Sequence, residues 1–193
     1  DLAQVSALPD VLSRLAKTYA EVTGLVCCAG RGRFGSLEEF AYREIRELVD
    51  LNLISQMYVV RAFMPVIKTN GGGDVVLMGS EAALSGGRYG AVYSATKFAV
   101  RGFAQALRHE CAAANVRITI VNPGMVRTEF FDSLKFEPGS NPDNYIEPED
   151  VASAVCGALL VRRGTVVDEI NLSPQKRVVR RKTDDSKFTD NGH

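Results

Sequence analysis

Short apolar or β-branched segments alternate along this chain with longer segments of helical periodicity. The short segments cover residues 23–28, 74–78, 117–121 and 166–172, and the long ones cover residues 8–19, 37–68, 91–114 and 148–160. Strands that alternate with helices form a parallel sheet whose right-handed crossovers place the helices on its faces. The order of segments therefore predicts an α/β fold, and ligands of such sheets bind at the carboxyl ends of the strands.

Local signals suggest where some of these elements begin. Ser36 precedes the second helical segment, and Glu39 follows at the spacing of a capping box. Pro148, followed by two acidic residues, is typical of a first helical turn. The glycines at 71–73 predict a turn before the second strand. We therefore expect one continuous helix from Leu37 to about residue 68.

Composition narrows the class of protein. The chain has 193 residues, of which 46% are hydrophobic and 24% charged, as is usual for one globular domain. Lys+Arg and Asp+Glu both number 23, so no net charge attracts nucleic acid or a membrane surface. No apolar run reaches the ~18 residues of a membrane span, and the first residues lack a signal-peptide pattern. We expect a cytoplasmic protein that binds neither nucleic acid nor membrane.

The four cysteines give no sign of a disulfide or metal site. Cys27 and Cys28 are neighbours, which rarely bridge each other, and Cys111 and Cys156 stand alone. Neither a Cys-x-x-Cys pair nor a histidine cluster is present. We expect buried, reduced thiols and no metal.

Tyr93 and Lys97 form the strongest chemical signal in the sequence. They are four residues apart, so on a helix their side chains share one face. A lone tyrosine titrates near pH ~10, but a lysine cation beside it favours the phenolate and lowers that pKa. The pair therefore predicts acid–base chemistry near neutral pH.

Further residues place this pair in a larger pattern. Asn52 and Ser80 precede Tyr93 and Lys97 in the order and approximate spacing of the catalytic tetrad of short-chain dehydrogenases/reductases, a family that the chain resembles from Asp1 to about residue 180. The segment 27–30 (Cys-Cys-Ala-Gly) stands where that family has Asn-Asn-Ala-Gly, and 122–124 (Asn-Pro-Gly) matches its Pro-Gly segment. A Tyr-x-x-x-Lys pair alone is common by chance, whereas the ordered set is specific.

The resemblance implies a Rossmann-like, doubly wound parallel sheet and an oxidoreductase that moves hydride between NAD or NADP and a carbonyl or alcohol. Tyr93 would protonate the carbonyl oxygen, or take the proton of the alcohol in the reverse direction. Lys97 would lower the pKa of Tyr93 and hold the nicotinamide ribose. Ser80 would donate a hydrogen bond to the substrate oxygen, and Asn52 would hold a water that links Lys97 to solvent.

The resemblance also implies a set of cofactor contacts. Cys28 stands where the family usually has Asn, and a thiol cannot supply the donors and acceptors of an amide. Ala29 and Gly30 still allow the backbone to approach the cofactor closely. The implied set is Asp1, Leu2, Cys28, Ala29, Gly30, Tyr93, Lys97, Pro123, Gly124, Val126 and Thr128, with Asn122 beside the nicotinamide.

One part of the family pattern is missing from the sequence. The family begins with a strand and a Gly-rich turn that holds the dinucleotide phosphates, whereas Asp1-Leu2 resembles the dipeptide after its third strand. We expect two strand–helix units, about fifty residues, to be missing, and the chain as given to bind NAD(P) weakly. The side chain that separates NAD from NADP would lie there, so the choice between them stays open.

The segment 30–35, Gly-Arg-Gly-Arg-Phe-Gly, fits the pattern G-x-G-x-x-G but is a poor dinucleotide fingerprint. Such a fingerprint needs a short helix and then a second strand that ends in an acidic residue. A helical pattern of about thirty residues follows instead. We interpret these glycines as the tight turns of a loop.

The C-terminal third is harder to interpret. Aromatic and apolar side chains gather where the family covers its substrate, or they simply pack on the domain: Phe130, Phe131, Leu134, Phe136 and Tyr145. We expect a partial oxidoreductase domain over residues 1–174 and a polar, frayed tail over 175–193, whose basic run is solvated.

Two alternatives concern assembly and function. The long helices carry apolar residues on more than one face, namely Met57, Tyr58, Val59, Phe98, Val100 and Phe103. This predicts a homodimer or homotetramer, for which the resemblance implies a two-fold bundle of these helices. The alternative is that the chain's own loops bury these side chains.

A second class of function competes with the enzyme. The chain could be a cofactor-free binding or scaffold protein derived from the same fold.

Overall fold

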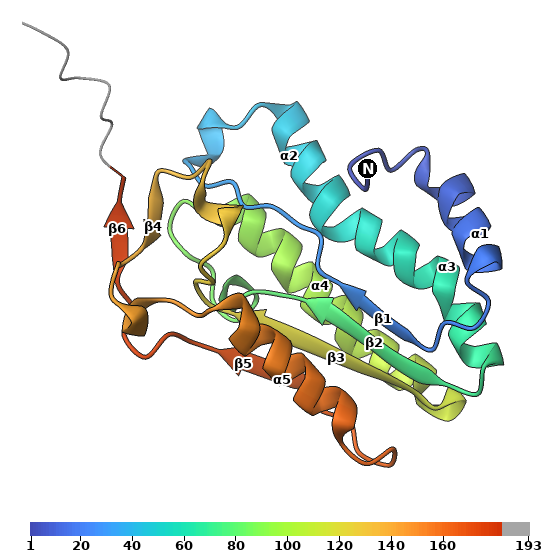
Figure 1. Cartoon of the computed structure of the whole chain (residues 1–193). Coiled ribbons are helices and arrows are strands. Elements are labelled where there is room, and N and C mark those ends of the chain that lie inside the picture. Colours follow the sequence, from blue (N-terminus) through green and yellow to red (C-terminus); the bar gives the residue numbers. More distant parts are fainter. Residues whose placement is uncertain (183–193) are drawn as a thin grey trace, which may run out of the picture.

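A computed structural model describes residues 1–182, and a parallel sheet of four strands runs through its centre (Figure 1). The strands lie in the order β1 (Gly24–Cys27), β2 (Gly73–Met78), β3 (Val116–Pro123) and β5 (Glu169–Leu172). Every neighbouring pair is parallel. The predicted α/β fold with a parallel sheet is confirmed.

Helices cover both faces of this sheet (Figure 1). The helices α1 (Leu8–Thr18), α3 (Ser55–Thr69) and α4 (Ala91–Cys111) pack on one face, and α5 (Pro148–Leu160) packs on the other. Alternate residues of the strands supply the two cores, because successive side chains of a strand point to opposite faces. Val75 and Leu77 join the first core, whereas Val76 joins the second.

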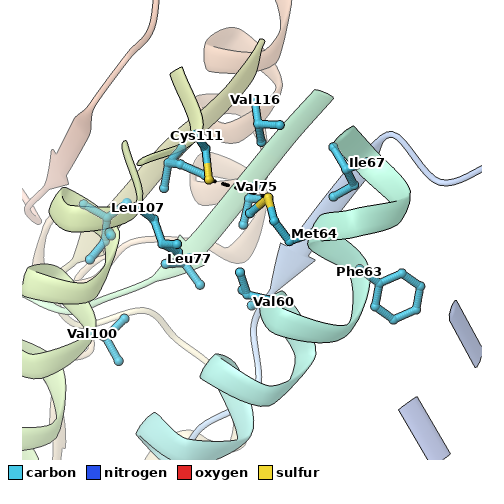
Figure 2. Close-up of a cluster of buried hydrophobic side chains, with 14 of the residues drawn as sticks. Val60, Phe63, Met64, Ile67, Val75, Leu77, Val100, Leu107, Cys111 and Val116 are labelled. Atoms are coloured by element: carbon cyan, nitrogen blue, oxygen red, sulfur yellow. Dashed lines mark hydrogen bonds between the residues drawn. The ribbon is translucent and has the colours of Figure 1, made fainter. Parts of the chain in front are cut away.

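The larger core is closely packed between α3, α4 and the sheet (Figure 2). Ile67 and Val75 are fully buried, and Val60 is 2% exposed. The thiol of Cys111 donates to the sulfur of Met64 at 3.6 Å across the two helices. Each such side chain stabilises the fold by roughly 1.5–3 kcal/mol on burial, so this core holds both helices in place beneath the site.

A buried ion pair joins the amino ends of the central strands to α5. Asp74 and Arg117 are opposite each other in the β2–β3 register, and Arg117 Nε lies 2.6 Å from Asp74 Oδ1. The same guanidinium donates to the carbonyl oxygens of Leu159 and Val161, each at 2.9 Å, just where α5 ends. Arg117 therefore satisfies carbonyls that a helix end leaves without partners.

The expected helix over residues 37–68 is right for most of its length but begins later, at Tyr42, and runs to Thr69 through a π-helical turn. A 3₁₀ turn (Leu37–Glu39) is followed by α2 (Tyr42–Val49), a π-helical turn (Asp50–Ile54) and then α3. Ser36 makes no side-chain capping bond; instead the Ala41 N–H donates to Glu44 Oε2 at 2.9 Å at the start of α2. Phe40 lies between the 3₁₀ turn and α2, and its side chain packs against the cluster around Leu48.

Other boundaries agree with the sequence or depart from it. The glycine turn is confirmed, with Gly71 and Gly72 at φ of 84° and 109°, and α5 begins at Pro148 as expected. The first strand was expected to be buried, but β1 is the edge of the described sheet, and Val26 is 48% exposed.

The predicted frayed tail is wrong for residues 175–182. Here β6 (Val179–Arg181) pairs antiparallel with β4 (Phe136–Pro138), forming a ribbon beside the carboxyl end of the sheet (Figure 1). Residues 183–193 of that expected tail lie outside the described part of the chain. The division of the chain at residue 174 stays a prediction.

Candidate active site

A cavity of about 1170 Å³ opens at the carboxyl end of the sheet, where the fold predicts a ligand site. It brings together Ser80, Tyr93 and Lys97 of the predicted tetrad. It also takes in six residues of the predicted cofactor set in addition to Tyr93 and Lys97, namely Cys28, Gly30, Pro123, Gly124, Val126 and Thr128. Five predicted residues do not line it, namely Asn52, Ala29, Asn122, Asp1 and Leu2.

Tyr93 and Lys97 lie one turn apart on α4 and are almost fully buried, at 6% and 5% exposure. The Lys97 ammonium donates to the carbonyl oxygen of Met78, the last residue of β2, at 2.9 Å. The ammonium nitrogen also lies 5.8 Å from the centroid of the Tyr93 ring. The shared helical face expected from their spacing is therefore present.

The pKa values of this pair differ from the sequence-based expectation. Burial raises the pKa of Tyr93 above its usual value, which the Ser80 hydroxyl opposes and the Glu81 carboxylate reinforces. Burial lowers the pKa of Lys97 to about 8, against a smaller opposite effect of Cys28. The expected net lowering of the Tyr93 pKa is not found, because desolvation of the buried phenol outweighs the groups that favour its anion. At neutral pH this keeps the Tyr93 phenol protonated.

Ser80 stands at the end of β2, beyond Gly79. Its side chain accepts a hydrogen bond from the Ala82 N–H at 3.1 Å, which caps a short 3₁₀ turn and fixes the hydroxyl near Tyr93. A side chain at position 79 would overlap the Asn122 amide, so only glycine lets β2 end this close to β3. The hydroxyl groups of Ser80 and Tyr93 therefore converge on one place.

Asn52 lies in the π-helical turn and is 1% exposed. Its side chain holds the backbone of Arg31: Oδ1 accepts from the Arg31 N–H, and Nδ2 donates to the Arg31 carbonyl, both at 2.9 Å. Nδ2 also donates to the Thr96 hydroxyl at 3.2 Å. The amide thus acts on the loop beside the cavity, and its predicted role in holding a water stays a prediction.

The backbone after β1 forms one wall of the cavity. A Cβ atom on Gly30 would lie 3.3 Å from Asn52 Oδ1 and 3.5 Å from Lys97 Nζ, so the missing side chain leaves the backbone bare beside the ammonium. Cys28 is exposed there, contrary to the expectation of buried thiols, as is Cys156 elsewhere. This bare backbone fits a ligand that approaches closely, as a cofactor ring would.

Pro123, the last residue of β3, and Gly124 after it form another wall of the cavity. The Gly124 N–H donates to the Leu172 carbonyl at 2.8 Å, and the buried Asn122 donates to Asn171 Oδ1 at 3.0 Å. Asn122 thus points along the sheet rather than toward the cavity. Asp1 is exposed, Leu2 packs against the larger core and neither lines the cavity, so their contact with a cofactor stays a prediction.

Sequence reasoning missed several residues that position the site. Gln56 is buried four residues after Asn52 and donates to the Ala29 carbonyl at 2.7 Å; this i, i+4 spacing was the available signal. The Thr96 hydroxyl donates to the Tyr93 carbonyl at 2.7 Å. Glu81 forms an ion pair with Arg177 of the C-terminal segment at 3.0 Å, which no local pattern indicates.

The described part of the chain offers neither a metal site nor a membrane-spanning helix. Within residues 1–182, no group of three or more His, Cys, Asp or Glu side chains is arranged to hold a metal ion. None of the helices in this part of the chain is both long and apolar enough to cross a membrane.

Comparison with known proteins places the chain in a family. The model of the short chain dehydrogenase family matches residues 1–138. Sepiapterin reductase of Chlorobaculum tepidum is 29% identical over 174 residues, which cover 90% of this chain and 70% of the reductase. The NADP-dependent 3-hydroxy acid dehydrogenase of Schizosaccharomyces pombe is 28% identical, with the same coverage.

Solved structures agree with this result. The alcohol dehydrogenase of the archaeon Thermococcus sibiricus, complexed with 5-hydroxy-NADP, superposes with a TM-score of 0.80 at 27% identity, covering 92% of this chain and 74% of that protein. Serine dehydrogenase of Escherichia coli superposes with a TM-score of 0.73 at 24% identity. With an α/β sheet, a tyrosine–lysine pair at its carboxyl edge and this match to the family model, the chain belongs to the short chain dehydrogenases and is an NAD(P)-dependent oxidoreductase.

Proposed function

We propose that this enzyme reduces a carbonyl group of a small molecule, with Tyr93 as the general acid and Ser80 as a hydrogen-bond donor to the same oxygen. The observation that carries the proposal is the convergence of both hydroxyls with Lys97 in one cavity. With its pKa raised by burial, Tyr93 is protonated at neutral pH, as the general acid of a reduction must be.

The residues present fit a nicotinamide cofactor. The backbone at Gly30 and Gly124, which carries no side chain, flanks the cavity. The Lys97 ammonium lies between the cavity and the end of β2. We infer that Lys97, Gly30, Pro123 and Gly124 hold the nicotinamide end, together with Cys28, Val126 and Thr128 at the cavity wall. When bound, NADH or NADPH supplies a hydride.

Tyr93 would supply the proton of this reduction. As a hydride from the bound cofactor reached the carbonyl carbon, Tyr93 would transfer its O–H proton to the carbonyl oxygen, and the Ser80 hydroxyl would donate a hydrogen bond to the same oxygen. The product would be an alcohol. The Tyr93 phenolate then regains a proton from solvent, with the Lys97 ammonium beside it to stabilise the anion.

Turnover of a panel of ketones with NADPH and with NADH, followed by the absorbance of the reduced nicotinamide, tests this function. Because we expect the chain as given to bind NAD(P) weakly, each nucleotide is supplied in large excess. We expect turnover with at least one of the two nucleotides, and the nucleotide with the larger kcat/KM identifies the cofactor. Tight binding of ketones without turnover by either nucleotide would contradict the proposal and favour a binding protein of the same fold.

We also propose a homodimer or homotetramer built on the outer faces of α3 and α4, in the cytoplasm. Tyr58 and Phe98 are 37% and 43% exposed on these helices. Three predicted contact residues do not belong to this surface, because Val100 is 1% exposed beneath α4, and Val59 and Phe103 pack against the larger core. The exposed pair is the apolar surface that a partner subunit would cover.

Replacing Phe98 with Glu should dissociate the oligomer, because the charge would have to be desolvated at the interface. Light scattering at micromolar concentration measures the mass of the wild type and the variant. Phe103→Glu should instead lower stability, since this side chain packs on the chain's own core. A wild-type protein that has the mass of a monomer would contradict the proposal.

A further inference from the structure

The glycine-containing loop at 30–35, which the catalytic residues do not explain, is held rigidly beside the cavity. The Asn52 amide brackets the backbone of Arg31 through two hydrogen bonds. At the other end, the Gly35 N–H donates to the Tyr89 carbonyl at 2.8 Å. Between these two ends, ion pairs join the loop to α2: Arg31 lies 3.1 Å from Glu47, and Arg33 lies 2.7 Å from Glu44. The loop is therefore fixed at both ends and in the middle.

This fixed loop places Phe34 against the catalytic tyrosine. The ring centroids of Phe34 and Tyr93 are 5.1 Å apart with an angle of 50° between the planes. A side chain at Gly32 would overlap the ring of Phe130 and come within 2.9 Å of Phe34. The glycine is thus needed where two aromatic side chains pass the loop, rather than for a phosphate.

Phe34 is one member of a closed circuit of aromatic rings that all line the cavity. Phe34 contacts Phe136 with centroids 5.0 Å apart at 81°, and Phe136 contacts Phe131 at 5.9 Å. Phe131 contacts Phe130 at 5.3 Å, and Phe130 returns to Tyr93 at 6.0 Å. Tilted and edge-to-face contacts of this kind are the favourable arrangements of aromatic pairs.

The far side of the circuit is also held in place. Phe136 begins β4, which pairs with β6. The Lys182 ammonium donates to the Phe131 carbonyl at 2.5 Å. The segment 123–145 is mostly irregular, but the part that carries the rings is tied to the ribbon of β4 and β6. The aromatic wall is therefore preformed.

From these contacts we propose that the substrate is a bulky carbonyl compound with an aromatic or fused-ring group next to the carbonyl, and that Phe34 determines this specificity. The inference rests on the proposed reduction at Tyr93. A ring attached to the carbonyl carbon would lie along the wall formed by Phe34, Phe130 and Phe136 when its oxygen meets Tyr93. A small aliphatic carbonyl would leave this apolar wall in contact with water and gain nothing from it.

The volume is consistent with such a substrate. At about 1170 Å³ the cavity exceeds the ~300–1,000 Å³ of ordinary ligand pockets. It has room for a nicotinamide and a multi-ring substrate side by side.

Competition between acetylnaphthalene and acetone tests the proposal, with the preferred nicotinamide as the reductant. We expect kcat/KM for acetylnaphthalene to exceed that for acetone by about 100-fold or more, from the apolar area that its rings bury. Phe34→Leu should lower the ratio of kcat/KM for acetylnaphthalene to kcat/KM for acetone by about tenfold, the size of a lost aromatic pair. Tyr42→Leu, 93% exposed on α2, is the matched loss of a ring outside the cavity and should change either value by less than about twofold.

A binding measurement separates failure of this inference from failure of the proposed function. The chain contains no tryptophan, so the fluorescence of acetylnaphthalene reports its binding with little background from the protein. Binding that weakens in Phe34→Leu, without turnover of any ketone, would support the aromatic site and overturn the reduction chemistry. Turnover of acetone at the same kcat/KM as acetylnaphthalene, or equal losses for both in Phe34→Leu, would overturn the inference alone. Neither binding nor turnover would overturn both.

Discussion

Replacing Tyr93 with Phe is expected to lower kcat/KM for carbonyl reduction by about 10³-fold, within the range that a positioned general acid contributes. The variant loses only the hydroxyl that donates the proton. Its ring keeps the contacts with Phe34 and Phe130, at centroid distances of 5.1 and 6.0 Å, so folding and nucleotide affinity should not change. Steady-state kinetics and calorimetric titration with the nucleotide measure the two effects separately.

Tyr42→Phe is the control for this substitution, because it removes the same hydroxyl from a side chain that is 93% exposed. It should leave kcat/KM unchanged. Turnover by Tyr93→Phe near the wild-type rate would remove Tyr93 from the mechanism.

The pH dependence gives a second signature of the same pair. Burial lowers the pKa of Lys97 to about 8, so the ammonium loses its proton as pH rises through that value. We expect kcat/KM for reduction to be constant below pH 8 and to fall above it, as the cation that stabilises the Tyr93 phenolate is lost. In Lys97→Arg, whose guanidinium stays charged, this fall should be absent; a wild-type profile that is flat across pH 8 would contradict the role of Lys97.

The lowered pKa of Lys97 also affects the stability of the fold, which should rise with pH where kcat/KM falls. Between pH 8 and the unfolded value of 10.5, the unfolded chain binds a proton that the native chain has released. Stability from this group therefore increases with pH across that window. Burying the charge at neutral pH costs about 3 kcal/mol, at 1.36 kcal/mol for each pKa unit, which the enzyme tolerates to keep an ammonium beside Tyr93.

The second large effect is expected at the other end of the sheet, where Arg117→Ala should lower the free energy of unfolding by about 3–5 kcal/mol, as loss of one partner of a buried ion pair does. The substitution leaves Asp74 without its 2.6 Å partner and removes the donors from the Leu159 and Val161 carbonyls at the end of α5. Urea or guanidinium denaturation measures the change, with the slope of the transition checked for two-state behaviour.

Arg163→Ala provides a matched control for Arg117. Arg163 pairs with the same Asp74, at 3.4 Å, but its side chain is 67% exposed. Surface ion pairs contribute about 0–1 kcal/mol, so this variant should be nearly as stable as the wild type. If both variants lost the same stability, burial of Arg117 would not be the cause.

The position of these groups was predictable from sequence to different degrees. Tyr93 and Lys97 were found because i, i+4 spacing places two side chains on one helical face wherever the helix lies. Pro148 fixed the start of α5 for a similar reason, since its ring suits the first turn of a helix. The π-helical turn at residues 50–54 could not be predicted from the helical pattern, because its Asn52 side chain bonds to Arg31, twenty-one positions away in the chain.

What the sequence alone determined about this protein is local or periodic: the alternation of strands and helices, the parallel sheet, and the set of residues that shares its carboxyl edge. Only the tertiary structure decided the direction of the Tyr93 and Lys97 pKa shifts, the pairing of β6 with β4 and the seat of Phe34 on Tyr93. Each of these depends on burial by, or contact with, segments far away in the chain. Residue spacing records geometry within one element, whereas desolvation and ring packing arise between elements.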